Sequence, residues 1–393
     1  MKSTKLAAIM MFFIMLSGCQ QPGEDNSYLR MDHLLTEEEA VEELKEFKSN
    51  FKDIEQWEAR AKVIREGILK GTELFPLPEK TPLKPVFRNK REYNGYTVEN
   101  VAIESLPGVF VTGSIYRPAG LTGKAPGILC PHGHWGSPDD YGRYRLDMQL
   151  RCATLARMGA VVISYDMLGY GEMREWGIIH RAPKTLKTQL WNSIRLLDFL
   201  VSLPEIDTER IGITGASGGG TQAFLLAAVD DRVTVSVPAV MVSAHMFGGC
   251  VGESGMPIHK SENHVTNNVE IAATFAPKPM LLISDGGDWT KNNPEVEFPY
   301  IQDIYNMYGK KELVENFHIP DEGHDYGYTK RSGMYPFMAK HLGLDIEKVT
   351  GEDGKVDESG IEFEHMYQME VFNSVNPVPS YAIRSNAEIW PEK

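Results

Sequence analysis

The segment from residue 210 to residue 229 constrains the fold more than any other part of the chain. Residues 210–214 form a short apolar run typical of a buried strand, and residues 221–229 form an apolar run typical of a helix. The six residues between them read Gly-Ala-Ser-Gly-Gly-Gly, with Ser217 third in the row. Because a strand that turns directly into a helix leaves space only for small neighbours, this context predicts a sharp turn with Ser217 at its apex. A tight turn without catalysis is the alternative interpretation.

Strand-like and helix-like segments alternate along most of the chain. Residues 97–103 and 109–116 alternate apolar and polar residues around a Pro-Gly pair, which predicts a leading hairpin. Further strands are expected at 127–131, 160–165, 210–214, 233–237, 280–284 and 315–319, and helices at 147–158, 185–203 and 221–229. Apolar strands that alternate with helices indicate an α/β fold class, with a mostly parallel sheet covered by helices on both faces.

A serine hydroxyl is a weak nucleophile at neutral pH, so it needs a base and an acid that orients the base. His324 follows the last expected strand, and the glycine before it lets the chain bend and present the imidazole. The acid should follow the strand at 280–284, where Asp285 and Asp288 both qualify. Asp288 is preferred because two glycines before it free the loop to reach the imidazole. Other histidines after Ser217 compete less well, since most precede the acid strand, alternate within a strand or lie on the closing helix: His245, His259, His264, His318, His341 and His365.

This chemistry also needs two backbone N–H groups to stabilise a developing oxyanion. Gly218, directly after the serine, is expected to supply one of these N–H groups. The other is expected from the loop after the strand at 127–131, where His134 is preferred and Trp135 is the alternative. Trp135, Trp289 and Tyr170 are expected to line the substrate site, although packing beneath the loop is an equal alternative for the side chains of His134 and Trp135. The chain has no CxxC or HExxH spacing, so we expect no metal site and no cofactor.

The first residues predict export and lipid anchoring. Two lysines precede an apolar run, Leu6 to Leu16, that is too short to span a bilayer as a helix. The following Leu-Ser-Gly-Cys resembles a bacterial lipoprotein box, in which cleavage precedes Cys19 and the cysteine is acylated. An ordinary signal peptide with a chance cysteine is the alternative. Gln20 resembles an outer-membrane sorting signal, so the expected location is the bacterial cell envelope, held to the membrane by lipid.

Composition divides the chain into five parts. After a signal peptide at 1–18 we expect a polar tether at 19–35, a helical leader with a Pro-rich connector at 36–95, a catalytic domain at 96–344 and an extension at 345–393. Thr36 and the glutamates after it predict a capped helix start, with helical spacing through about Lys70. The irregular stretch at 240–277 is too long for a simple connection, so it predicts a cap or loop over the site.

Charge and cysteine content restrict the partners. The formal net charge of -14 argues against nucleic acid, because phosphate binding requires clustered Lys and Arg. Beyond Cys19 the chain has three cysteines, so at least one stays unpaired or pairs between chains. Cys130 and Cys152 are expected to be buried as small apolar residues.

Five motifs together resemble the acetylxylan-esterase-like and dienelactone-hydrolase-like branch of the bacterial α/β-hydrolases, over about Tyr96 to Leu344. They are PHGHWG at 131–136, DMLGYGE at 166–172, GASGGG at 215–220, GGDWT at 286–290 and EGHDYG at 322–327. The resemblance implies an α/β-hydrolase fold and a serine esterase that removes acetyl groups from plant or algal polysaccharides through an acyl-enzyme on Ser217.

Three other functions remain open from the sequence. A pectin or uronate methylesterase would use the same site, although the acidic composition weighs lightly against a polyanionic substrate. A serine peptidase related to prolyl oligopeptidases would need a propeller, for which the leader is too short. A non-catalytic binder on a hydrolase fold is disfavoured by the complete set of catalytic residues.

Overall fold

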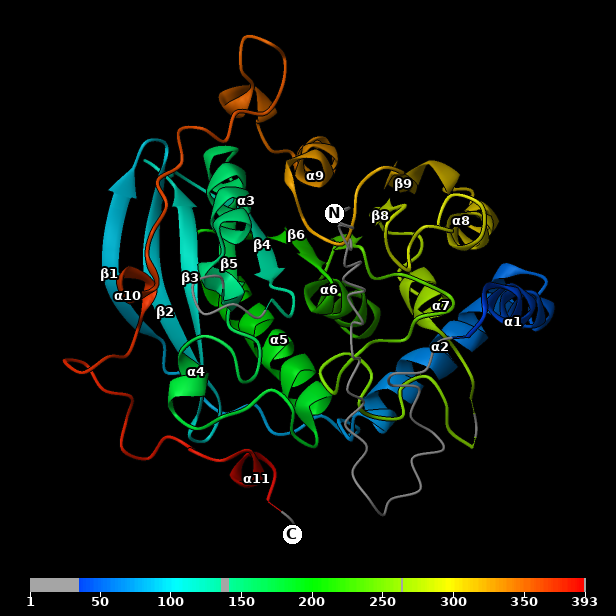
Figure 1. Ribbon diagram of the computed structural model, residues 1–393, viewed down its shortest axis with the longest axis horizontal. Helices are drawn as coiled ribbons and strands as arrows, with labels where there is room; N and C mark the ends of the chain where they lie inside the picture. The colour runs from blue at the N-terminus through cyan, green and yellow to red at the C-terminus, as the bar shows by residue number, and fades with distance from the viewer. Residues whose placement is uncertain (1–34, 136–140, 263, 392–393) are drawn as a thin grey trace, which may run out of the picture.

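The computed structural model describes residues 35–135, 141–262 and 264–391. Within them, nine strands form one sheet in the order β1-β2-β3-β5-β4-β6-β7-β8-β9 (Figure 1). The first pairs, from β1 to β5, are antiparallel, and every later pair in that order is parallel. This arrangement confirms the predicted α/β-hydrolase fold. The strands are β1 (Val86–Tyr93), β2 (Tyr96–Leu106), β3 (Val109–Pro118), β4 (Ala125–Pro131), β5 (Val161–Tyr165), β6 (Ile206–Ala216), β7 (Val235–Ala239), β8 (Met280–Asp285) and β9 (Val314–Ile319).

Helices cover both faces of the sheet because strand side chains alternate between the faces. On β4, Leu129 packs into a core with the helices α2, α5, α6, α7 and α8, whereas Ile128 and Cys130 pack into a second core with α3 and α9. The helices are α1 (Glu37–Ser49), α2 (Ile54–Gly71), α3 (Leu146–Arg157), α4 (Glu172–Glu175), α5 (Thr185–Ser202), α6 (Gly218–Val229), α7 (Asn268–Ala273), α8 (Glu297–Met307), α9 (Tyr328–Leu342), α10 (Met366–Met369) and α11 (Asn386–Ile389), with short 3-10 helices η2 (Gly142–Tyr144), η3 (Lys311–Leu313) and η4 (Ile346–Val349).

The leader differs from expectation in two ways. Thr36 caps α1 together with Glu39, as predicted, but the helical pattern breaks into two helices because Asp53 caps a new one through the backbone N–H of Gln56. The second difference is β1, which lies inside the segment 36–95 yet pairs with β2, so the sheet begins before residue 96. Its charged and half-exposed residues hid this edge strand from pattern reasoning.

The C-terminal segment runs along the antiparallel side of the sheet, beside β1–β3 and α4 (Figure 1). It is tied there by buried polar groups. The fully buried guanidinium of Arg143 donates to the carbonyl of Met369, and Glu172 accepts hydrogen bonds from the backbone N–H groups of Val371 and Phe372. Arg143 also pairs with Asp166 and with Glu172, so the extension is joined to the loop that follows β5.

The predicted signal peptide, Cys19 and all but the last residue of the tether lie outside the described residues. Among the residues that the structure describes, no helix is both long enough and apolar enough to cross a membrane. The predicted cap region at 240–277 consists of turns around the short helix α7, and most of its described side chains are buried.

Candidate active site

The predicted site residues follow parallel strands at the edge where those strands end. Ser217 follows β6, His134 follows β4, Asp288 follows β8 and His324 follows β9. Because the carboxyl ends of neighbouring parallel strands share one edge of the sheet, residues far apart in sequence meet in this region, which is where α/β proteins bind their ligands.

Ser217 stands at the apex of a strained turn. Its backbone φ is 55° and its ψ is -125°, an uncommon conformation for a residue other than glycine. The glycines beside it are required by close approach: a Cβ on Gly215 would lie 2.6 Å from the carbonyl oxygens of Gly219 and Pro131, and a Cβ on Gly219 would lie 2.4 Å from the latter oxygen. The N–H of Ser217 donates to the carbonyl of Ala239 on the next strand, which holds the turn in place.

His324 and Asp288 are in direct contact. The imidazole Nδ1 lies 2.6 Å from Oδ2 of Asp288, and the backbone N–H and hydroxyl of Thr290 both donate to the other carboxylate oxygen at 2.6 Å. Asp285, the alternative acid, is fully buried and pairs at 3.3 Å with Lys330 on α9. The structure therefore pairs the imidazole with the preferred acid and gives Asp285 a different partner.

Two of the three predicted aromatic residues flank the imidazole. The ring centroid of Trp289 lies 4.4 Å from that of His324, and the centroid of Trp135 lies 5.6 Å from it. A Cβ on Gly133 would lie 2.9 Å from both the Trp135 ring and the carbonyl oxygen of Ala216, so the indole and the residue before the serine both pack against this glycine.

A cation lies against the same indole. The guanidinium of Arg145 lies 4.5 Å from the centroid of the Trp135 ring, and its Nε donates to Asp147 at 2.7 Å.

The loop after β4 lies against the start of α6, where the oxyanion donors are expected. A Cβ on Gly218 would lie 2.2 Å from Cε1 of His134, so that imidazole covers the first residue of the helix. The loop is fixed by His132, whose Nδ1–H donates to the carbonyl of Gly133 and whose Nε2 accepts the backbone N–H of Met167. Burial lowers the pKa of His132 to about 4, which keeps the ring in this neutral form.

Tyr170, the third predicted aromatic residue, is more enclosed than the two tryptophans. Tyr141 stacks on it at 4.8 Å, and the rings of His132, His134 and His180 lie 5.1 to 5.6 Å away. One face of the Tyr170 ring is therefore covered by protein.

Three polar residues that the sequence did not single out surround the side chain of His134. Glu253 Oε1 lies 3.0 Å from its Nδ1, Cys250 Sγ lies 3.6 Å from the same atom, and His180 Nε2 lies 3.2 Å from that sulfur. Burial lowers the pKa of His134, but Cys250 and Glu253 outweigh this effect and raise it to about 10; burial and the His134 ring lower the pKa of His180 to about 3. Together with His134, these residues come from three separate loops, so no motif spacing in the sequence could have revealed the cluster.

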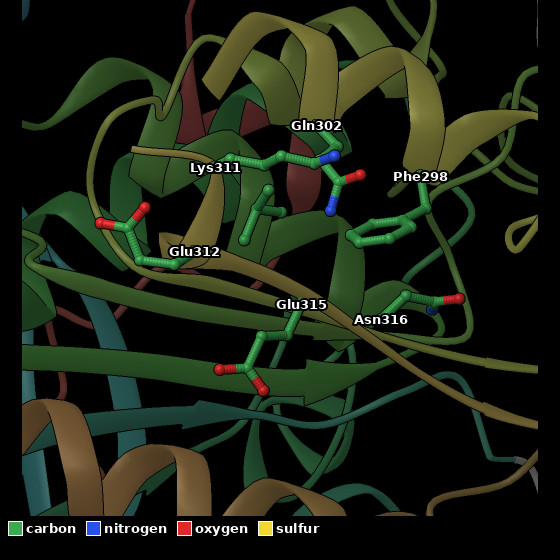
Figure 2. A pocket seen from close by; sticks show the side chains of 7 residues that line it. Phe298, Gln302, Lys311, Glu312, Glu315 and Asn316 are labelled. Atoms are coloured by element: carbon green, nitrogen blue, oxygen red, sulfur yellow. The ribbon is translucent and has the colours of Figure 1, made fainter. Parts of the chain in front are cut away.

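The competing histidines have other partners. His318 contacts the hydroxyl of Ser284, His259 contacts Asn268, and His264 contacts Ser261. A hollow elsewhere, at the open edge of the sheet, is also separate from the site (Figure 2). Its walls come from α8, η3 and β9, with charged side chains from Lys311 and Glu312, and no described site residue lines it.

Comparison with known proteins places these features among ester hydrolases. The structure matches that of methylesterase BT1017 with a TM-score of 0.83 and 40% sequence identity, over 91% of this chain and 79% of that one. It also matches a glucuronoyl esterase from Solibacter usitatus with a TM-score of 0.54 and 16% identity, over 74% of this chain and 94% of that one, a likeness that concerns the fold alone.

Two sequence comparisons also match hydrolases. The family model for fungal glucuronyl esterases matches residues 179–246, which include the serine turn. The Bacillus subtilis (strain 168) protein YtaP, which is named as a hydrolase, is 28% identical over 182 residues, which is 42% of this chain and 59% of YtaP. The chain thus spans less than two thirds of that curated relative.

Proposed function

Since the chain belongs to the α/β-hydrolase esterase family that includes methylesterase BT1017, and so is a carboxylic ester hydrolase of the carbohydrate-esterase type, we propose that it removes methyl groups from esterified uronic acids of a polysaccharide. The observation that carries this proposal is the 40% identity to a methylesterase over 91% of the chain, together with the contact between His324 and Asp288.

In the proposed mechanism, Ser217, His324 and Asp288 hydrolyse the ester in two steps. Ser217 Oγ attacks the ester carbonyl carbon while His324 takes the hydroxyl proton, and Asp288 stabilises the imidazolium through Nδ1–H. The backbone N–H groups of Gly218 and His134 stabilise the oxyanion. The intermediate expels methanol, which receives the proton from His324 and leaves the uronate carbonyl as an ester on Ser217. Water, deprotonated by the same imidazole, then releases the acid.

This proposal reverses the preference drawn from sequence motifs, which placed an acetyl group first and a methyl ester second. The net charge of the chain weighs lightly against a polyanionic substrate, but specificity depends on the groups near the reacting ester rather than on the sum over the chain. Arg145 lies beside the indole that contacts His324, and it supplies a positive charge at that place. A neighbouring uronate carboxylate is the substrate group that such a guanidinium recognises.

The test compares two released products. We expect the purified chain to liberate methanol from a methyl-esterified polyuronate faster than acetate from acetylated xylan. Ser217→Ala should lower methanol release by at least about a thousandfold, whereas Ser359→Ala, at an exposed serine, should leave it unchanged. Faster release of acetate would overturn the methylesterase proposal, and an active Ser217→Ala variant would show that another group is the nucleophile.

We also propose that the protein is exported and anchored in the cell envelope through an acylated Cys19. The support is the Leu-Ser-Gly-Cys sequence after a short apolar run with two leading lysines. In a bacterial host, the wild-type chain should incorporate a labelled fatty acid and sediment with membranes. Cys19→Ser should lose the label and leave the membrane fraction, and a labelled Cys19→Ser protein would refute the anchoring site.

A further inference from the structure

A cluster of side chains of the types that bind soft metal ions lies at the loop after β4, which carries the proposed oxyanion donor His134. It consists of His134 after β4, His180 between α4 and α5, and Cys250 in the 240–277 segment, with one donor atom from each lying within 4.8 Å of the others. Glu253 joins them through its contact with His134. The esterase mechanism uses the backbone N–H of His134, but it gives no task to any of these four side chains.

The distances within the cluster are close to those around a tetrahedral ion. Zinc bonds of about 2.0–2.1 Å to nitrogen and 2.3 Å to sulfur place such donors about 3.6 Å apart at the tetrahedral angle. The observed separations from Cys250 Sγ are 4.0 Å to His134 Nε2 and 3.2 Å to His180 Nε2. One donor atom from each of the three residues lies within 4.8 Å of the others, so rotation of the side chains must bring them closer to bond a single ion.

The surroundings already orient two of the side chains. The Nδ1–H of His180 donates to the carbonyl of Leu168 at 3.1 Å, which leaves the lone pair of Nε2 directed at Cys250. Glu253 accepts the backbone N–H of Gly249 at one oxygen and places the other 3.0 Å from His134 Nδ1. Metal-binding histidines typically have such outer partners, because these fix the tautomer and the direction of the ring.

Close packing holds the cluster between loops. A Cβ on Gly252 would lie 2.4 Å from the imidazole of His180, just as one on Gly218 would meet the imidazole of His134. The side chain of His134 is 15% exposed and that of Glu253 is 6% exposed. The donors are therefore largely, but not completely, removed from water.

We propose that His134 through Nε2, His180 through Nε2 and Cys250 through Sγ bind one zinc ion, with water in the fourth position and Glu253 as the outer partner of His134. The ion would join the loop after β4 to the loop that carries His180 and to the 240–277 segment. A thiolate with two imidazoles favours zinc over the hard cations magnesium and calcium, which prefer oxygen ligands. Binding replaces the S–H bond of Cys250 by an S–Zn bond, and the proton is released to solvent together with any proton on the two imidazoles. The ion positions a loop and does not take part in ester hydrolysis.

The test uses the full chain, reduced and stripped of metal with a chelator, and titrated with zinc chloride or cobalt chloride. We expect one zinc ion per chain, and a thiolate-to-cobalt charge-transfer absorption with cobalt. Cys250→Ser should abolish that absorption, and Cys250→Ser and His180→Gln should each weaken zinc binding by about a hundredfold or more. His365→Asn, at an exposed histidine that caps α10, is the matched control and should bind zinc as the wild type does.

Melting temperatures distinguish a variant that has lost a zinc ligand from a variant that has failed to fold. Zinc should raise the melting temperature of the wild type and of His365→Asn but not that of Cys250→Ser, whose circular dichroism should stay native. Binding in less than one equivalent, or equal zinc affinity in the wild type and Cys250→Ser, would overturn the site. Because these measurements use no ester substrate, their failure would leave the proposed esterase function intact.

Discussion

Glu297 allows a quantitative test of how the helix α8 is joined to the loop that follows β7. Its side chain is 1% exposed, and one carboxyl oxygen accepts the backbone N–H of Ala244 at 3.1 Å, while the other has no hydrogen-bond partner. Burial raises its pKa from 4.5 to about 7. The unfolded chain therefore loses this proton at lower pH than the folded chain does, so the contribution to stability is lost as pH rises from about 4.5 to 7.

The size of the effect follows from that shift. The rise of the pKa from 4.5 to about 7, at about 1.4 kcal/mol for each tenfold change in proton affinity, corresponds to about 3 kcal/mol of destabilisation at pH 8 and to less than about 1 kcal/mol at pH 4.5. Glu297→Gln keeps an oxygen for Ala244 and cannot ionise. It should therefore raise the melting temperature by several degrees at pH 8 and change it little at pH 4.5.

Differential scanning calorimetry at the two pH values measures this difference. Glu79→Gln, at an exposed glutamate outside this site, controls for the change in net charge and should leave the melting temperature nearly constant. The reasoning would be refuted if Glu297→Gln gave the same shift at both pH values, or if it were less stable than the wild type at pH 8.

Two further predictions concern the catalytic groups. In Asp288→Asn, the two donors of Thr290 would keep the amide oxygen, so the amide nitrogen would face Nδ1 of His324 and impose the wrong tautomer. The value of kcat should therefore fall by roughly a thousandfold or more. Asp285→Asn, the matched change at the other carboxylate, should mainly lower the melting temperature. In Arg145→Gln, KM for a methyl-esterified polyuronate should rise by about three- to tenfold with kcat for a neutral aryl acetate nearly unchanged, and an equal effect on both substrates would contradict a role in carboxylate recognition.

The strand, turn and helix around Ser217 could be predicted because the two apolar runs and the small residues between them are adjacent in the sequence. The close approach that requires Gly215 and Gly219 also involves the carbonyl oxygen of Pro131 on β4, which no local pattern shows. The edge strand β1 could not be predicted in the same way, since its outer side meets solvent and its residues carry charge in place of an apolar alternation.

The sequence limited the acid that orients His324 to two aspartates, but it could not decide between them. Asp285 ends β8 and Asp288 lies three residues later, so their roles depend on what the rest of the fold brings near them. Lys330, far along the chain on α9, pairs with Asp285, whereas the glycines after β8 bring Asp288 to His324. A distant partner, absent from any local motif, thus determines which carboxylate is free to orient the base.

His134 shows how one residue can serve two purposes at this edge of the sheet. Its backbone N–H is the proposed oxyanion donor, and its imidazole contacts Glu253 and Cys250 in the 240–277 segment. A backbone donor is effective only if its direction is fixed before the charge develops. A loop residue has no ladder partner, so the contacts of the His134 side chain with the 240–277 segment restrict the position of this residue. In the proposed mechanism, the segment predicted as a cap would therefore help to fix the direction of the oxyanion donor.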